Sequence, residues 1–239
     1  MRKEAENMIQ YSFERFEKKY FITKLQKEKL LKRTGNMISA DEYGVTPVLN
    51  IYYDTENWDL IRASVEKPGY KEKLRVRSYG VPKGSVFAEI KKKCGGVVYK
   101  RRISGSNSDI AKMLAGKMEF RGQIGDEIGW FQNRYNTFPR VFIGYDRIAY
   151  FGKEDKNVRI TFDENLRWRD YDLDLSLGDY GEPILSENKI LMEIKIPGAC
   201  PLWLARALSE LEIYPTSFSK YGECFVNKIL TKKEAHLCA

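Results

Sequence analysis

Charged and apolar side chains alternate along several short segments of this chain. In KEKLRVRSYG, the side chains of Lys73, Arg75 and Arg77 fall on one face of an extended segment, and Leu74 and Val76 fall on the other. The segments FAEIKKK and ILMEIKIPG repeat the pattern with Glu89, Lys91, Glu193 and Lys195. One such strand is typical of a solvated outer face. Several together indicate an inward-facing charged surface that binds a polyanion.

These residue types suit the chemistry of phosphates. The planar guanidinium of arginine donates hydrogen bonds in pairs to phosphate oxygens, and lysine adds a compact point charge. A glutamate among them can hold a hard divalent ion such as Mg²⁺ or Mn²⁺. Phosphoryl transfer needs aligned reactants and charge stabilisation more than covalent work by the protein. Burying this many cations with few glutamates would be costly, so an anionic ligand is expected.

The overall composition agrees with a phosphate-bearing partner. The 239 residues include 41 Lys and Arg against 33 Asp and Glu, which gives a formal net charge of +8. The four cysteines show no C-x-x-C spacing and His236 is the single histidine, so a zinc site is not expected. Reduced cysteines, together with the lack of a signal peptide or an apolar run of about 18 residues, predict a cytoplasmic protein with no membrane segment.

The order of elements predicts how the charged faces are positioned. Strands are expected at 12–22, 46–55, 140–152, 157–168 and 189–197, with two hairpins turning at 81–84 and 94–96. A capping box formed by Thr23 and Gln26 predicts a helix that ends near Gly35. Further helices are expected near Asn57, within 106–137, from Pro201, and along 218–229. With no linker or repeat, residues 1–239 are interpreted as one domain of the α+β class, an antiparallel eight-stranded β-barrel with peripheral helices.

At these strands the sequence resembles a known family, the catalytic domain of the vacuolar transporter chaperone (VTC) polyphosphate polymerases within the CYTH-like triphosphate tunnel metalloenzymes. The similarity lies in the order of nine segments: RFEKKYFI, LNIYYDT, LRVRSYG, FAEIKKK, VYKRRIS, YDRIAYFG, VRITFDENLRW, LMEIKIPG and SFSKYGECF. The resemblance implies a tunnel whose interior binds a triphosphate or a growing phosphate chain with one divalent metal, Mn²⁺ or Mg²⁺.

The resemblance also implies roles for individual residues. The phosphate ligands would be Lys19, Arg75, Arg77, Lys91, Lys100, Arg147, Arg159, Lys195 and Lys220. Arg75, Arg77, Lys220 and Glu193 would carry catalysis, and Glu193 would bind the metal. Glu17 and Glu89 would either add metal ligands or pair with neighbouring cations. The register within VYKRR leaves Arg101 and Arg102 as alternatives to Lys100.

The first strand distinguishes branches of the superfamily. Triphosphatases and cyclase-like members carry E-x-E-x-K here, whereas this chain has Arg15, Glu17 and Lys19. A cation at the first position resembles the polymerase branch.

Three functions remain open on the sequence. The first is a polyphosphate polymerase that transfers the terminal phosphate of ATP, or another nucleoside triphosphate, onto a polyphosphate chain. The second is a hydrolase of inorganic or nucleoside triphosphate, and the third is a non-catalytic polyphosphate- or nucleotide-binding module. Nucleic acid is not an expected partner, because it would need an exposed basic stripe. The sequence identifies no membrane partner.

Overall fold

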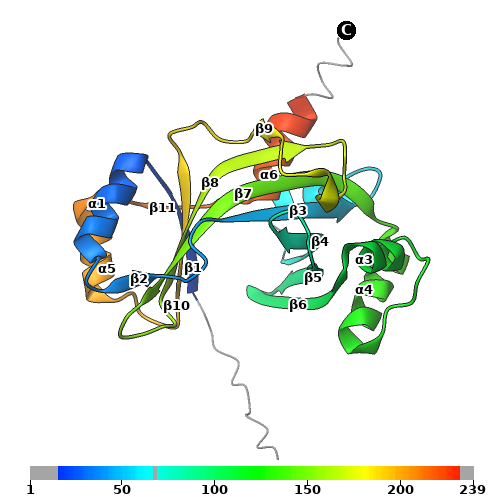
Figure 1. The fold of residues 1–239 in the computed structure, drawn as a ribbon, viewed down its shortest axis with the longest axis horizontal. Coiled ribbons are helices and arrows are strands. Elements are labelled where there is room, and N and C mark those ends of the chain that lie inside the picture. The colour runs from blue at the N-terminus through cyan, green and yellow to red at the C-terminus, as the bar shows by residue number, and fades with distance from the viewer. Residues whose placement is uncertain (1–15, 67–68, 232–239) are drawn as a thin grey trace, which may run out of the picture.

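The computed structural model describes residues 16–66 and 69–231, and its centre is one strongly curved antiparallel sheet (Figure 1). The main path of hydrogen-bonded strands runs β11-β1-β10-β8-β7-β3-β4-β5-β6, and the short strands β2 and β9 pair with β7 and β8. The strands are β1 (Phe16–Ile22), β2 (Ile38–Ala40), β3 (Thr46–Asp54), β4 (Tyr70–Tyr79), β5 (Ser85–Cys94), β6 (Val97–Ser106), β7 (Phe138–Gly152), β8 (Arg159–Arg169), β9 (Glu182–Pro183), β10 (Ile190–Ile196) and β11 (Pro215–Thr216).

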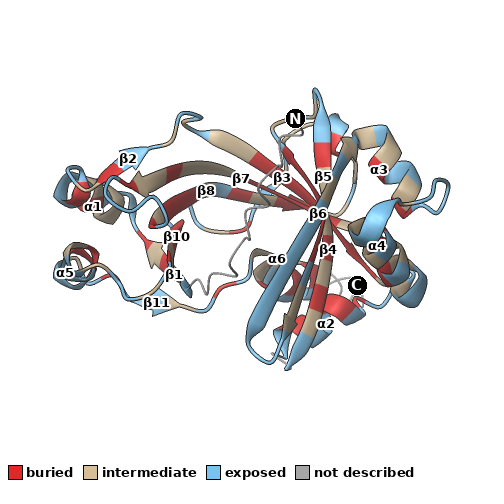
Figure 2. Cartoon of the chain, turned by 90° about the horizontal axis from the view of Figure 1, so that it is seen from below, coloured by how far each residue is buried: buried red, intermediate tan, exposed pale blue. Residues whose placement is uncertain are grey.

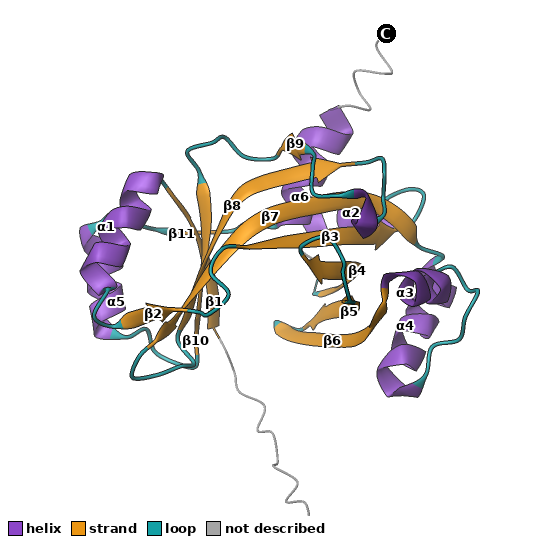
Figure 3. Ribbon diagram, viewed as in Figure 1, coloured by secondary structure: helices purple, strands orange, loops and turns teal. Residues whose placement is uncertain are grey.

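Two groups of helices cover the outer side of the sheet at its opposite ends (Figure 3), whereas α6 packs on the concave side. The α-helices are α1 (Lys24–Thr34), α2 (Asp59–Val65), α3 (Asn107–Leu114), α4 (Gly122–Tyr135), α5 (Leu202–Glu210) and α6 (Lys220–Cys224), with a 3₁₀ turn at Leu175–Leu177 and a π-helical turn at Phe225–Leu230. Helices α1 and α5 pack together at one end, and α3 packs on β5 and β6 at the other. Each group has its own apolar core, with Leu30 and Leu204 in the first and Ile110 and Phe131 in the second.

The sheet differs from the predicted closed eight-stranded barrel. It has eleven strands in the described part of the chain, three of them only two or three residues long, and no pairing there joins β6 to β1 or β11. The edge of β1 that would meet β6 is taken instead by β11, with Lys19 opposite Thr216 and Tyr20 opposite Pro215. The following segment leads directly into α6. Strand β6 is therefore left as an exposed edge, which is pale blue in Figure 2.

Most predicted elements are observed. Thr23 and Gln26 form the expected capping box at α1, and the strand predicted at 12–22 begins at Phe16 within the described residues. The turn between β5 and β6 uses Gly95 and Gly96 with φ of 54° and 88°, a region in which other residues are strained. No helix in the described ranges is long and apolar enough to cross a membrane.

Candidate functional site

The concave face of the sheet gathers the charged residues into one cavity, here called the central pocket. Cross-strand partners point to the same face of an antiparallel sheet. The register places Lys19 opposite Glu193, Arg75 opposite Glu89, and Lys73 opposite Lys91. The cavity has a volume of about 190 Å³. Its lining residues are Glu17, Lys19, Tyr52, Lys73, Arg75, Arg77, Glu89, Lys91, Lys100, Tyr145, Arg147, Glu193, Lys195, Ser219 and Lys220.

Nine of the lining residues are Lys or Arg and three are Glu, counted over the described residues. This excess of positive charge is compensated only in part by the protein. The pocket therefore has the composition of an anion site.

Glu89 anchors the arginines of β4. Its buried carboxylate lies 2.7 Å from the Arg75 guanidinium, 3.9 Å from that of Arg77 and 3.0 Å from Lys100 Nζ. Burial would raise the pKa of Glu89, but the charges of Arg75, Arg77 and Lys100 outweigh it and lower the pKa to about 2. Glu89 is therefore ionised and held by three cations, which favours the ion-pairing role among the alternatives given to it.

Two buried tyrosines orient the same arginines. Arg75 donates to the Tyr52 hydroxyl at 3.0 Å, and Arg77 donates to the Tyr145 hydroxyl at 3.3 Å and to Asn50 Oδ1 at 2.9 Å. Burial would raise the pKa of Tyr145, but the nearby cations, Arg147 foremost, lower it to about 8. These contacts fix the direction of both guanidinium groups before any ligand enters.

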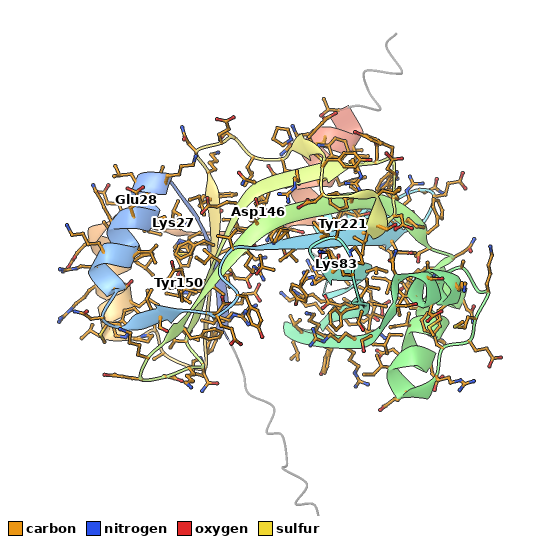
Figure 4. All side chains as sticks on the ribbon, in the orientation of Figure 1. Lys27, Glu28, Lys83, Asp146, Tyr150 and Tyr221 are labelled. Atoms are coloured by element: carbon orange, nitrogen blue, oxygen red, sulfur yellow. The ribbon has the colours of Figure 1, made fainter. Side chains whose placement is uncertain are left out.

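Helix α6 is fixed above the pocket through Tyr221. The Tyr221 ring stacks on Tyr52 with 4.6 Å between centroids, and its hydroxyl donates to Asp54 Oδ2 at 2.9 Å; Tyr221 is labelled in Figure 4. Asp54 also accepts from the backbone amides of Leu60 and Ile61 at the start of α2. The helix thereby holds Lys220 over the concave face.

Asp163 on β8 joins two of the predicted phosphate ligands. Arg147 donates to both of its carboxylate oxygens at 2.6 and 2.8 Å, and Lys220 Nζ donates to Oδ2 at 2.6 Å. Burial would raise the pKa of Asp163, but the charges of Lys220 and Arg147 outweigh it and hold the pKa below its ordinary value. Asp163 thus positions one arginine and one lysine from separate elements at one point.

The opposite wall, formed by β1 and β10, has a different arrangement. The Glu193 carboxylate lies 2.7 Å from Lys195 Nζ, and the Glu17 carboxylate lies 3.8 Å from the same ammonium. Lys19 lies 3.7 Å from Glu17 and donates to the Phe218 carbonyl at 2.9 Å. Burial would raise the pKa of Glu193, but Lys195 and, next, Arg147 lower it far below the ordinary range. Both carboxylates on this wall are bound by lysines.

Lysines of β4, β5 and β6 face one another across the sheet. Lys91 lies opposite Lys73 on one side and Lys100 on the other. Burial and the neighbouring charges lower the pKa of Lys73 to about 8, and burial also lowers the pKa of Lys91. Lys91 makes no salt bridge to a carboxylate of the described residues. Like charges placed directly opposite destabilise a sheet, so this arrangement favours a bound anion.

The predicted metal ligands can be tested against this geometry. No group of three or more His, Cys, Asp or Glu side chains that could hold a metal occurs among the described residues. The oxygens of Glu193 and Glu17 lie around one ammonium, and the buried Thr161 hydroxyl, opposite Glu193 in the register, has no hydrogen-bond partner in the described part of the chain. These hard oxygen donors fit Mg²⁺ or Mn²⁺ if phosphate and water complete the coordination.

The structure brings together all but one of the predicted phosphate ligands. Arg159 does not line the central pocket; it lies in an adjoining cavity, over the Phe151 ring at 5.1 Å. Within VYKRR, the side chain of Lys100 points into the central pocket. Arg101 forms a salt bridge with Glu127 on the outer face, and Arg102 lines the adjoining cavity. Arg15 and His236 lie outside the described residues.

Sequence reasoning missed Asp163, Tyr52 and Tyr145 as site residues. Asp163 follows Arg159 by four residues on one strand, so alternation alone places it on the same face. Tyr145 stands two residues before Arg147 in the same way. The spacing predicts that Lys73 lies on the inward face but assigns it no role.

Comparison with known proteins agrees with this architecture. A family model of the VTC domain matches residues 14–227. A solved structure of a candidate adenylate cyclase from Bacillus halodurans superposes with a TM-score of 0.53 at 12% identity, covering 85% of this chain and 92% of that chain. This likeness shows a shared fold.

Other solved structures match with TM-scores below 0.5, among them two candidate cyclases. One is a candidate adenylate cyclase from Vibrio parahaemolyticus (0.47, 14% identity, 88% of this chain and 97% of that chain). The other is a candidate adenylyl cyclase from Hippeastrum described as having a dominant triphosphatase activity (0.49, 14% identity, 87% and 93%). A search of curated proteins gave no significant match. The family match spans most of the chain and includes both walls of the central pocket, so the chain belongs to the VTC domain family.

Proposed function

We propose that this protein transfers the terminal phosphate of a nucleoside triphosphate to the end of a polyphosphate chain. The observation that carries the proposal is the central pocket itself, in which nine lysines and arginines converge from six strands and α6. A terminal oxygen of the chain attacks the γ-phosphorus, the bond from that phosphorus to the bridging oxygen breaks, and the nucleoside diphosphate leaves. The arginines and lysines bind the phosphate oxygens and hold the two reactants in line.

The acceptor in this proposal is the phosphate chain, and the one serine hydroxyl in the described lining already serves to cap α6. That serine is Ser219. Its hydroxyl accepts from Lys73 at 3.1 Å and from the Gly222 amide at 3.2 Å, which caps α6. A divalent ion held by Glu193 and Glu17 would neutralise charge on the transferred phosphoryl group.

Hydrolysis is the second candidate function, and the open edge of the sheet favours it. Lys91 on β5 and Lys100 on β6 line the pocket on the side where β6 has no second neighbouring strand among the described residues. Water can therefore approach the same phosphorus from that side. Polymerase and hydrolase differ only in which oxygen acts as acceptor.

Product analysis distinguishes the two functions. Purified protein is incubated with ATP and Mn²⁺, with and without a short polyphosphate primer. Acid-insoluble polymer and ADP are expected. Free phosphate or pyrophosphate without polymer would instead establish the hydrolase, and nucleotide binding with no turnover would establish a binding module.

Lys220→Ala tests the transfer step. Lys220 is supplied by α6 and bonds Asp163, whereas Arg75 and Arg77 are held independently by Glu89. We expect chain elongation to fall at least about tenfold while affinity for a non-hydrolysable ATP analogue changes less than about threefold. Equal losses of binding and elongation would contradict a role of Lys220 in positioning the acceptor.

A further inference from the structure

A second cavity of about 1000 Å³ adjoins the central pocket, and Arg147 lines both. It lies where β3 begins and β7 ends, under the loop between β2 and β3. Small-molecule sites typically measure about 300–1,000 Å³. The central pocket, at about 190 Å³, is too small to hold a nucleoside in addition to phosphates. The nucleoside of a triphosphate bound there must therefore lie outside it, and the second cavity is large enough.

Aromatic rings line this second cavity. Tyr43 and Tyr79 are 73% and 54% exposed, and Phe87 lies edge-on to Tyr79 with 6.0 Å between centroids. Large exposed aromatic side chains that border a cavity offer faces on which a planar ring can stack. Such stacking strengthens the binding of any nucleotide, because every base has a π-face. The central pocket provides no comparable surface, because Tyr52 is already stacked on Tyr221 and the Tyr145 ring packs against Arg147 and Lys220.

The described lining of the second cavity combines two carboxylates with five cations, which are Arg102, Arg147, Lys153, Lys156 and Arg159. Asp41 and Glu42 line it, and Asp41 Oδ1 is buried without a hydrogen-bond partner among the described residues. An unpaired carboxylate oxygen needs a donor, which a ribose hydroxyl or an exocyclic amine supplies and a phosphate does not. Two of its cations, Arg102 and Arg159, are packed on the rings of Phe87 and Phe151.

We propose that this cavity, here called the aromatic mouth (Asp41, Tyr43, Tyr79 and Phe87), binds the nucleoside of the donor nucleotide. The inference rests on the proposed function, in which a nucleoside triphosphate is the phosphate donor. The base stacks on Tyr79 and Tyr43, Asp41 accepts a hydrogen bond from the ribose or the base, and the phosphates pass Arg147 into the central pocket. The protein therefore prefers a nucleoside triphosphate to inorganic tripolyphosphate.

To test this site, calorimetric titration without divalent metal measures the affinity for three ligands. They are a non-hydrolysable ATP analogue, inorganic tripolyphosphate and a long polyphosphate. The variant carrying both Tyr43→Ala and Tyr79→Ala should bind the ATP analogue about tenfold more weakly and both inorganic ligands within about twofold of wild type. Asp41→Asn should weaken the analogue about threefold. Tyr214→Ala, at a tyrosine that is 70% exposed and outside both cavities, is the matched control.

These binding measurements test the nucleoside site independently of the reaction that the protein catalyses. If the double tyrosine variant loses affinity for all three ligands equally, the cavity binds phosphates and the proposal is overturned. It is also overturned if the variant loses none of them, or if wild type binds tripolyphosphate as tightly as the ATP analogue. Because the experiment measures binding, its result remains valid even if product analysis shows hydrolysis in place of polymer synthesis. Unchanged thermal denaturation would show that the exposed tyrosines are not needed for folding.

Discussion

The tripeptide Glu-Ile-Lys occurs twice on the concave face, in β5 as residues 89–91 and in β10 as residues 193–195, and its two copies behave differently. In β5, the Glu89 side chain is 1% exposed and held by three cations from β4 and β6. In β10, the Glu193 side chain is 10% exposed, and its salt-bridge partner within the described residues is Lys195 of the same tripeptide.

The neighbouring strands cause this difference. The register puts Arg75 opposite Glu89 on one side and Arg102 on the other, whereas it puts Lys19 and Thr161 opposite Glu193. An arginine fork binds a carboxylate more rigidly than lysine does. One wall is therefore a fixed arginine array built on its glutamate. The other wall keeps carboxylate oxygens that a metal can share. The role of the Glu-Ile-Lys tripeptide therefore depends on its position in the sheet.

The largest effect expected from this comparison concerns turnover. Glu193→Gln should reduce metal-dependent phosphate transfer on the order of 1000-fold, because a lost metal ligand removes stabilisation of the developing charge. Glu17→Gln should reduce it less, about tenfold. Initial rates measured over a range of Mn²⁺ concentrations check this. An unchanged rate of Glu193→Gln at every Mn²⁺ concentration, limiting ones included, would show that the β10 copy does not hold the metal.

The second expected effect is a loss of stability when Glu89, in the β5 copy of the tripeptide, is substituted. Glu89→Gln leaves Arg75 and Arg77 without their shared carboxylate, and we expect a loss of about 3 kcal/mol in the free energy of unfolding at pH 7. The pKa of Glu89 is lowered from 4.5 to about 2, so its contribution is complete above pH 4.5 and is lost as the pH falls toward 2. Urea denaturation at pH 7 and pH 3 measures both quantities.

Glu210→Gln is the matched control for this stability prediction, because its carboxylate pairs with Arg33 at an exposed position outside the central pocket, where an ion pair contributes little. Bound tripolyphosphate should restore part of the stability of Glu89→Gln by supplying new negative charge to the arginines. Equal stability of Glu89→Gln and wild type at pH 7 would mean that the arginines do not depend on Glu89.

The inward faces could be predicted from the sequence because strand alternation is a local property. Arg75 and Arg77 are two residues apart in one strand, and any pairing of that strand keeps them on one face. The capping box at Thr23 and the glycine turn at Gly95 are equally local signals. These features needed no knowledge of distant segments.

Closure of the sheet and the partners of each carboxylate could not be predicted in this way. The barrel stays open because two residues near the C-terminal end of the chain, Pro215 and Thr216, pair with β1 near its start. Arg159 shares a face with Asp163 but lies four residues earlier along the tilted strand, which carries it into the aromatic mouth. Both outcomes depend on contacts between segments that are remote in the sequence.

The smallest expected effect concerns pH and compares the lysines with the arginines. The pKa values of Lys73 and Lys100 are lowered to about 8, mainly by burial, whereas that of Arg75 is raised above its ordinary value because Tyr52 and Glu89 outweigh its burial. Affinity for tripolyphosphate should therefore fall about tenfold between pH 7 and pH 9, as the lysines lose their charge and the arginines keep theirs. Calorimetric titration across this range measures it.

The same lysines require the opposite trend in the stability of the unliganded protein. Between about pH 8 and pH 10 the unfolded chain binds more protons than the folded one, so the free energy of unfolding should rise with pH. Tyr145, whose pKa is also about 8, contributes in the same direction to both trends, and Tyr145→Phe separates its share from that of the lysines. The double substitution Lys73→Met and Lys100→Met should flatten both trends. Parallel changes of affinity and stability with pH would show that these lysines are not the titrating groups.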